Sequence, residues 1–217
     1  LMYALDVNAR ANNAEIAKAT GLDKSVVAYR INRLIEKGII QGFYTIIDAT
    51  KLGYDGFRVY LKYQYSSPAQ ERKLIEFLVQ NPSTWWVGTI DGVWDIGFVV
   101  WARGIYGFRN FWDDLMRKYR DMFQQSLVSV YTGLYHYSYA FLSPEKISGP
   151  IVQHIGSGKE TAISENEKRV LKVIADNARL PTVEIAKRAS LTPMIVKYAL
   201  KRLQEKSVIK GFRTIFN

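Results

Sequence analysis

The sequence predicts an α+β chain in which two copies of a small, helix-rich module flank a central sandwich of one sheet and two helices. Two observations predict this arrangement. Residues 1–48 and 170–217 align without a gap at an offset of 169 positions, with 19 identities in 48. Between them, strand-like and helical patterns follow each other in the order β-α-β-β-α-β. The predicted parts are module one at 1–48, the sandwich at 49–143, a linker at 144–163 and module two at 164–217.

Each module is predicted to hold two short amphipathic helices followed by a β wing. Apolar residues recur at helical spacing, as Val27, Ile31 and Leu34 show for the second helix of module one. The turn between the helices reads "ATGLDK" or "RASLTP", in which Asp23 or Thr192 can cap the second helix. The segments "IIQGFYTII" and "VIKGFRTIF" combine β-branched and aromatic residues around a glycine, which predicts a hairpin wing in each module.

The central part follows a pattern typical of a ferredoxin-like sandwich. Residues 57–66 predict a strand, 69–80 a helix, and "TWWVGTI" and "VWDIGFVVWA" two strands joined at Asp91-Gly92. A helix at about 106–122 and a last strand, "SLVSVYTGLYHYSYAFL", complete the βαββαβ order.

The stretch between the sandwich and module two, residues 144–163, mixes Pro, Gly and Ser without periodicity, which predicts a linker. Ser164 and Glu167 then form a capping-box pattern for the next helix. Module one begins at Leu1 inside the equivalent helix and without Met, so we expect the true beginning to be missing. The chain stops where module one passes into the sandwich, which leaves open whether a second sandwich follows Asn217.

Charge and composition favour an anionic partner. The formal net charge is +10, and 12 basic against 5 acidic residues lie in 164–217. No apolar run is long enough for a membrane helix, and no signal peptide pattern is present, so we expect a cytoplasmic protein. With no cysteine and two histidines, the sequence offers no thiolate or histidine-rich metal site and no cysteine nucleophile, and no cofactor is expected.

Two short helices with a turn, the second polar on one face and followed by a wing, form the winged helix-turn-helix pattern. The segment "NARANNAEIAKATGLDKSVVAYRINRLIEKGIIQGFYTIID", followed by the βαββαβ order, resembles the leucine-responsive regulatory protein (Lrp/AsnC) family of archaeal and bacterial transcription regulators. The resemblance covers about 1–143, with a second copy of the DNA-binding half at 164–217. It implies a regulator that binds double-stranded DNA, forms a homodimer or higher homo-oligomer, and responds to a small-molecule effector such as an amino acid.

The second helix of each module carries the candidate DNA-binding residues. On a helical wheel they lie opposite the apolar face or on its flank, where they can enter a major groove. Such a face can also be merely solvated, and position 199 has Ala where module one has Arg30. Lys206 and Lys210 lead from this helix into the wing of module two. The candidates are Lys24, Ser25, Ala28, Tyr29, Arg30, Asn32, Arg33, Met194, Lys197, Tyr198, Lys201 and Arg202.

In the family that the chain resembles, the effector lies near the turn between the second and third strands of the sandwich. Here that turn contains Gly92, Trp94 and Asp95, similar to the family's Gly-x-aromatic-Asp pattern. A glycine allows close approach of the backbone, and a carboxylate can receive a ligand amine. The alternative is a tight hairpin whose Asp caps the turn.

The last strand of the sandwich carries an aromatic stripe. The predicted face holds Tyr131, Tyr135, Tyr137, Tyr139 and Phe141, with Leu134 and His136 on the other face. Stacking of RNA bases is one use of such a stripe. Packing in a homodimer is favoured over it, and His136 is interpreted as a packed residue.

Two other functions remain open. A siroheme decarboxylase shares this architecture, but it needs basic and histidine side chains in the sandwich, which here is nearly charge-balanced and has one histidine. An architectural DNA-binding protein would differ from a regulator in its lack of sequence preference. Without paired carboxylates, a nucleophile triad or a metal cluster in the sequence, an enzyme is not expected.

Overall fold

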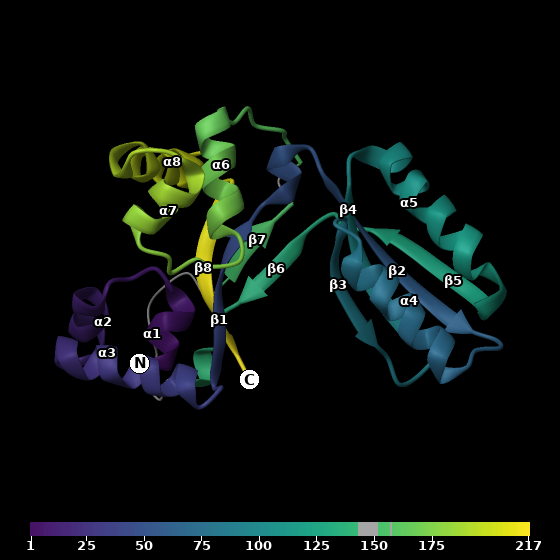
Figure 1. The fold of residues 1–217 in the computed structure, drawn as a ribbon, viewed down its shortest axis with the longest axis horizontal. Coiled ribbons are helices and arrows are strands. Elements are labelled where there is room, and N and C mark those ends of the chain that lie inside the picture. The colour runs from purple at the N-terminus through teal and green to yellow at the C-terminus, as the bar shows by residue number, and fades with distance from the viewer. Residues whose placement is uncertain (143–151, 157) are drawn as a thin grey trace. The chain divides into compact units, whose positions relative to one another are not determined.

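The computed structural model describes residues 1–142, 152–156 and 158–217, which form two compact units (Figure 1). The first unit comprises Leu1–Asp48, Tyr135–Ser157 and Thr161–Asn217, and the second comprises Ala49–Leu134 and Gly158–Glu160. Modules one and two therefore belong to the same unit, although the sandwich separates them in the sequence. Among the described residues, no helix is long and apolar enough to cross a membrane.

The second unit has the predicted βαββαβ order. Its four strands form an antiparallel sheet in the order β3-β4-β2-β5. The helices α4 and α5 both pack on one face, because Leu74, Leu78 and Leu115 share one buried cluster with Val59 and Phe98 of the sheet. The elements are β2 (Asp55–Tyr63), α4 (Pro68–Gln80), β3 (Thr84–Thr89), β4 (Ile96–Ala102), α5 (Gly104–Tyr119) and β5 (Phe123–Val130), with 3-10 turns at Ala49–Leu52 and Arg120–Met122.

The first unit contains three helices and one strand from each module. In module one these are α1 (Met2–Val7), α2 (Asn13–Thr20), α3 (Lys24–Glu36) and β1 (Ile40–Ile47). In module two they are α6 (Glu165–Ile174), α7 (Thr182–Ala189), α8 (Pro193–Glu205) and β8 (Ile209–Phe216).

The predicted helix starts are confirmed in part. Ser164 and Glu167 form the expected capping box, and the Thr192 hydroxyl accepts a hydrogen bond from the Ile195 amide. Asp23 stands at the start of α3, but its side chain forms no capping bond. In the first unit, then, two of the three expected side-chain caps are present.

The predicted hairpin wings are wrong. Each module contributes a single strand, and β1 pairs with β8 in one antiparallel ribbon (Figure 1). The single glycine in each wing, Gly42 or Gly211, lies inside its strand and makes no turn. Pairing between the modules satisfies the strand edges that a hairpin would otherwise have satisfied locally.

The predicted last strand of the sandwich is also wrong, because it is two strands. β5 ends at Val130, and β6 (Leu134–Tyr137) pairs with β7 (Val152–Ile155) in a separate two-stranded sheet. β7 lies within the predicted linker at 144–163, and residues 144–151 and 157 of that linker are outside the described residues. A short 3-10 turn, Ala140–Leu142, follows β6. The sequence pattern did not indicate the break between the two strands at Thr132-Gly133, because the alternation of aromatic residues continues across it.

Candidate nucleic-acid interface

Helix α3 has one buried and one exposed face. Val27 and Ile31 are buried against the rest of module one. Ala28, among the candidate residues, is half-buried and lies at the edge of the exposed face. The other candidates on α3 are all exposed: Lys24, Ser25, Tyr29, Arg30, Asn32 and Arg33.

Helix α8 repeats this division with a different surface. Val196, Ala199 and Leu203 are buried. Since Ala199 stands where module one has the exposed Arg30, the polar face of α8 is narrower on that flank. Its candidate residues are all exposed: Met194, Lys197, Tyr198, Lys201 and Arg202.

Neighbouring side chains hold the two equivalent arginines of these faces. On α3, Arg33 Nη1 donates a hydrogen bond to the Tyr29 hydroxyl at 2.9 Å. On α8, the Arg202 guanidinium lies 5.9 Å from the centre of the Tyr198 ring and its Nε 3.9 Å from a Glu167 carboxylate oxygen. Both exposed faces thus carry an Arg-Tyr pair, but Arg33 bonds the Tyr29 hydroxyl, whereas Arg202 lies near the Tyr198 ring and near Glu167 of α6.

Two of the lysines of module two are engaged inside the protein. Lys206 Nζ donates to both carboxylate oxygens of the buried Glu167, at 2.9 and 2.8 Å. Burial raises the pKa of Glu167, but the hydrogen bonds from Lys206 and Ser164 outweigh it and lower the pKa overall. Lys210 Nζ lies 3.7 Å from the buried carboxylate of Asp48. Lys197 and Lys201, on the exposed face of α8, are therefore the stronger phosphate-contact candidates.

The modules contact each other through matching arginines. Arg10 Nη1 donates to the carbonyl oxygens of Ala178 and Leu180, at 2.7 and 3.2 Å. Arg179 Nη1 donates to those of Ala9 and Ala11, at 2.7 and 3.0 Å. Arg10 and Arg179 are equivalent residues in the two modules. Each of them bonds the backbone of the other module in the loop that precedes that module's helix-turn-helix pair.

A buried ion pair lies at the centre of the ribbon. Arg213, which is paired with Tyr44 in the β1-β8 register, donates from Nε and Nη2 to the carboxylate of Asp6 at 2.9 and 3.0 Å. The Tyr139 amide donates to the same carboxylate at 2.7 Å, and Arg213 also donates to the Tyr137 carbonyl. Burial raises the pKa of Asp6, and these hydrogen bonds and the guanidinium charge oppose that rise. The pair joins α1, β8 and the segment after β6.

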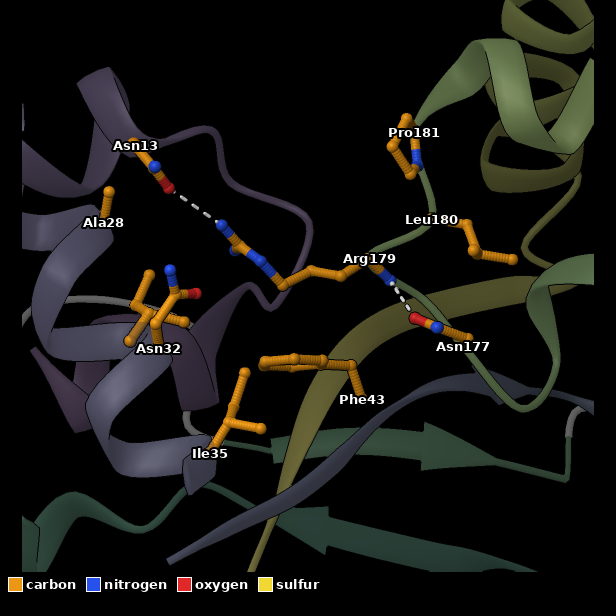
Figure 2. A pocket seen from close by; sticks show the side chains of 10 residues that line it. Asn13, Ala28, Asn32, Ile35, Phe43, Asn177, Arg179, Leu180 and Pro181 are labelled. Carbon is orange, nitrogen blue, oxygen red and sulfur yellow. Dashed lines mark hydrogen bonds between the residues drawn. The ribbon is translucent and has the colours of Figure 1, made fainter. Parts of the chain in front are cut away.

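A pocket of about 360 Å³ adjoins α3 at this contact between the modules (Figure 2). Arg179 reaches into it from module two, with Nη2 donating to Asn13 Oδ1 at 2.9 Å and the guanidinium 5.5 Å from the centre of the Phe43 ring. Ala28 and Asn32 line its α3 side. The candidate DNA face of module one thus borders a pocket of mixed polar and apolar lining, to which Asn177, Arg179 and Leu180 of module two contribute.

The predicted effector turn is held by its own aspartate. One oxygen of Asp95 accepts a hydrogen bond from the Tyr63 amide at 2.7 Å, and the Asp95 amide donates to the Leu61 carbonyl. Burial, followed by the charges of Glu71 and Asp95, raises the pKa of Tyr63 to about 12. The ring of Trp94 stacks on Tyr60 at 6.1 Å, and Gly92 is exposed. These contacts give Asp95 a structural role in the turn, which is the alternative to ligand binding.

The sheet face opposite α4 and α5 is rich in aromatic side chains that lie over glycines. A Cβ at Gly97 would meet the Tyr60 ring at 2.9 Å, and one at Gly56 would meet Tyr131 at 2.9 Å. Arg58 lies between these two rings, 5.5 Å from Tyr60 and 5.2 Å from Tyr131. The large exposed apolar residues of this face are Trp85, Trp86 and Leu127.

The structure divides the predicted aromatic stripe between the two units. Tyr131 contributes to the open face of the sheet, whereas Tyr135 and Tyr137 are exposed on β6 in the first unit. The single continuous face expected for Tyr131 to Phe141 is therefore wrong. His136 is half-buried on β6, and burial, followed by the charge of Arg213, lowers its pKa.

Sequence reasoning missed the residues that join the modules. Arg10 and Arg179 belong to the "NAR" that stands in both modules but lie outside the predicted recognition helices, and Asp6 and Arg213 belong to no predicted site. The repeated arginine was an available signal, because a charged residue kept in both copies outside the recognition helices needs a partner. The Asp6–Arg213 pair left no such signal, since Ala175 and Tyr44 stand at the equivalent positions. Among the described residues, no group of three or more His, Cys, Asp or Glu could hold a metal ion.

Comparison with known sequences finds one family model that matches parts of both modules. The family described as "Winged helix-turn-helix DNA-binding" matches residues 1–41 and 163–210. An uncharacterised HTH-type transcriptional regulator of Pyrococcus horikoshii is 31% identical over 126 residues, which cover 57% of this chain and 83% of that protein. Another from Pyrococcus abyssi is 35% identical over 98 residues, covering 44% of this chain and 65% of its own length. The chain thus spans just under two thirds of the latter relative.

Comparison with solved structures shows a shared fold. An AsnC family transcriptional regulator from Agrobacterium tumefaciens superposes with a TM-score of 0.57 at 17% identity, covering 64% of this chain and 90% of that one. The siroheme decarboxylase NirDL, in co-complex with an iron-uroporphyrin III analogue, superposes with a TM-score of 0.63 at 17% identity. That match covers 97% of this chain and 62% of the decarboxylase. At these identities the likeness establishes the fold alone.

Proposed function

We propose that this chain, which belongs to the family of HTH-type transcriptional regulators, is a duplicated winged helix-turn-helix regulator of the Lrp/AsnC type that binds double-stranded DNA sequence-specifically through α3 and α8. The observation that carries the proposal is that both helices bury their apolar side and expose a polar and basic one. Such a helix is the element that enters a major groove.

The two faces suit different contacts. On α3, Arg30, Asn32 and Arg33 are exposed, and Arg and Asn side chains form bidentate hydrogen bonds with guanine and adenine. On α8, Lys197 and Lys201 are exposed and favour the phosphate backbone. We therefore assign base reading mainly to module one and electrostatic binding mainly to module two.

Binding to a DNA duplex selected from a random library tests the proposal. Arg33→Ala should weaken binding to the selected duplex at least tenfold in fluorescence anisotropy. Arg72→Ala, which removes an exposed arginine from α4 in the other unit, is the charge-matched control and should leave affinity within twofold. Failure to enrich any duplex, or equal loss in both variants, would contradict sequence-specific binding through α3.

The second unit is proposed to form a homodimer through its open sheet face. Trp85, Trp86 and Leu127 are 45–50% exposed there, and monomers rarely expose a contiguous apolar patch of this kind. Leu127→Asp should convert a dimer into a monomer in light scattering, whereas Tyr135→Asp should not, because Tyr135 lies in the other unit. A wild-type monomer at micromolar concentration would exclude this interface.

An amino acid or similar amine is proposed as effector at Gly92, Trp94 and Asp95. One oxygen of Asp95 is already held by the Tyr63 amide, so a ligand would have to use the other oxygen. A bound ligand raises the melting temperature with saturation. Asp95→Asn should abolish that shift; if a panel of amino acids produces no shift in the wild type, the aspartate serves the turn alone.

The alternative function is that of a siroheme decarboxylase, because the fold resembles that of the siroheme decarboxylase NirDL. Both histidines of the chain, His136 and His154, lie in the first unit, which leaves the sheet of the second unit without one. This argues against a histidine-dependent tetrapyrrole site there. A purified protein with a Soret band, or one that gains it on mixing with a tetrapyrrole, would favour the enzyme.

Two further points belong to the proposed regulator. Footprinting on a selected duplex against random DNA separates it from an architectural DNA-binding protein, which would protect both equally. A cytoplasmic location is proposed with this function, because access to the chromosome requires it.

A further inference from the structure

The geometry points to a single chain reading an asymmetric DNA site, with α3 on one half-site and α8 on a second half-site of different sequence. This inference rests on the proposed DNA-binding function and specifies the substrate. One polypeptide would do what a symmetric dimer of single modules does. The two halves of its site would not be repeats of each other.

Contacts between the modules repeat when the modules are exchanged, that is, when 169 is added to each residue number of module one and subtracted from each of module two. The Ala9 amide donates to the Phe212 carbonyl, and the Ala178 amide donates to the Phe43 carbonyl, both at 2.9 Å. The Arg10 guanidinium lies 5.6 Å from the Phe212 ring centre, and that of Arg179 lies 5.5 Å from that of Phe43. Reciprocal contacts of this kind define an isologous interface, in which the same surface is used on both sides.

Further reciprocal bonds extend the match along the ribbon. The Thr45 hydroxyl donates to the Ile174 carbonyl at 2.6 Å, and the Thr214 hydroxyl donates to the Leu5 carbonyl at 2.9 Å. At the strand ends, Asn217 N bonds Ile39 O at 3.0 Å and Asp48 N bonds Val208 O at 2.8 Å. Exchange of the two modules converts each bond in these pairs into the other.

The strand register has the same symmetry. Phe43 pairs with Thr214 and Thr45 pairs with Phe212, so the ladder is unchanged when the modules are exchanged. The pair Tyr44–Arg213 is its own equivalent under this exchange, which places a pseudo-two-fold axis there. A two-fold axis relates the two recognition helices of dimeric helix-turn-helix proteins and sets them on adjacent half-sites. Here the axis lies within one chain.

The exposed faces of α3 and α8 do not share this symmetry. Ala28 and Asn32 of α3 correspond to Lys197 and Lys201 of α8, and Ser25 corresponds to Met194. Asn recognises adenine by paired hydrogen bonds, whereas Lys favours guanine or phosphate and Met offers only apolar contact. Only the Tyr29–Arg33 pair has an identical counterpart, Tyr198–Arg202. The exposed faces of α3 and α8 differ, while the pseudo-two-fold axis fixes how the two helices are placed relative to each other. We therefore expect two DNA half-sites of different sequence at a fixed separation.

A matched pair of cleavage probes tests the inference in the intact chain. Glu36 and Glu205 are equivalent and exposed, at the last residues of α3 and α8, and the chain has no cysteine. Glu36→Cys and Glu205→Cys can each carry an iron-chelate probe that cuts DNA nearby. On a selected duplex carrying one site, we expect the first probe to cut one half of the site and the second to cut the other half. Cutting of both halves by both probes would overturn the inference, and so would cutting by the Glu36→Cys probe alone.

A second measurement uses the sequences that the protein selects. The wild type should select two unlike half-sites. Lys197→Ala with Lys201→Asn, which gives α8 the residues that α3 has at positions 28 and 32, should shift the second half-site toward an inverted repeat of the first. Selection of an inverted repeat by the wild type would overturn the inference while leaving DNA binding intact. If no duplex is selected at all, the proposed function itself fails.

Discussion

Modules one and two are alike where they touch each other and unlike where they face solvent. The arginine bonds to backbone carbonyls and the threonine bonds are reciprocal to within a few tenths of an ångström, and the strand register is unchanged when the modules are exchanged. On the outer side of helices α3 and α8, by contrast, α8 has Lys197 and Lys201 where α3 has Ala28 and Asn32. Buried donors and acceptors must stay paired because an unsatisfied one costs about 1–3 kcal/mol. Exposed positions carry no such constraint, so α3 and α8 can differ at the positions where a partner would be recognised.

Removing module two should have the largest effect, because module one depends on it for its core. Ile40, Phe43 and Ile46 of β1 are at most 9% exposed, and β1 has its ladder partner in β8. A chain lacking 164–217 should therefore lose the cooperative unfolding of module one altogether, measured by hydrogen exchange of α3. The second unit, with its own core, should keep its protection and is the internal control. Protection of α3 in the truncated chain would show that module one folds alone.

The buried ion pair marks the point where the modules differ internally. Asp6→Ala would leave Arg213 buried without its partner, and such a loss typically costs about 3–5 kcal/mol. The equivalent positions hold Ala175 and Tyr44. The double variant Asp6→Ala with Arg213→Tyr, which copies that arrangement, should recover more than half of the loss in urea unfolding. If Asp6→Ala and the double variant are equally stable, Arg213 must hydrogen-bond water or another group once Asp6 is removed.

The charge difference between α3 and α8 should appear in the salt dependence of DNA binding. Each phosphate contact contributes about 0.9 to the slope of log affinity against log salt. Lys197→Ala with Lys201→Asn should lower that slope by about 1.8 if both lysines contact phosphates. The reverse exchange in module one, Ala28→Lys with Asn32→Lys, should raise it by a similar amount. An unchanged slope in the first variant would remove α8 from the DNA contact.

Local sequence patterns predict the elements of each module but not the contacts between the modules. The helix pairs, the βαββαβ order and the capping box at Ser164 follow from local periodicity and capping chemistry, and the structure has them. The pairing of β1 with β8 could not be predicted, because a lone strand and half of a hairpin have the same local pattern. Gly133 likewise gave too little signal to break the aromatic alternation between β5 and β6. The exposed face of α3 was predictable from spacing, whereas Arg10 and Asp6 bond partners that are far away in the sequence, 168 residues for Ala178 and 207 for Arg213.

A smaller effect is expected at Arg30, which module two replaces with the buried Ala199. If the Arg30 guanidinium reaches a base edge, Arg30→Ala should reduce the preference for the selected duplex over random DNA by roughly 1–3 kcal/mol. It should leave the salt slope within about one unit, since at most one phosphate contact is lost. Lys18→Ala on α2, an exposed change in the same module, is the control. Uniform weakening on all duplexes would instead make Arg30 a phosphate contact.

The smallest expected effect is a pH dependence that belongs to the first unit alone. Burial, followed by the charge of Arg213, lowers the pKa of His136 below its ordinary value near 6.5, and its Nε2 is buried without a hydrogen-bond partner among the described residues. Because the unfolded chain binds this proton more readily, the stabilisation is fully present above pH 6.5 and is lost as the pH falls toward the lower folded pKa. The unfolding free energy should therefore drop between pH 7 and 5, by at most about 1.4 kcal/mol per pH unit. His136→Gln should remove this dependence and His154→Gln, an exposed position, should keep it; the same drop in both variants would assign it to another group.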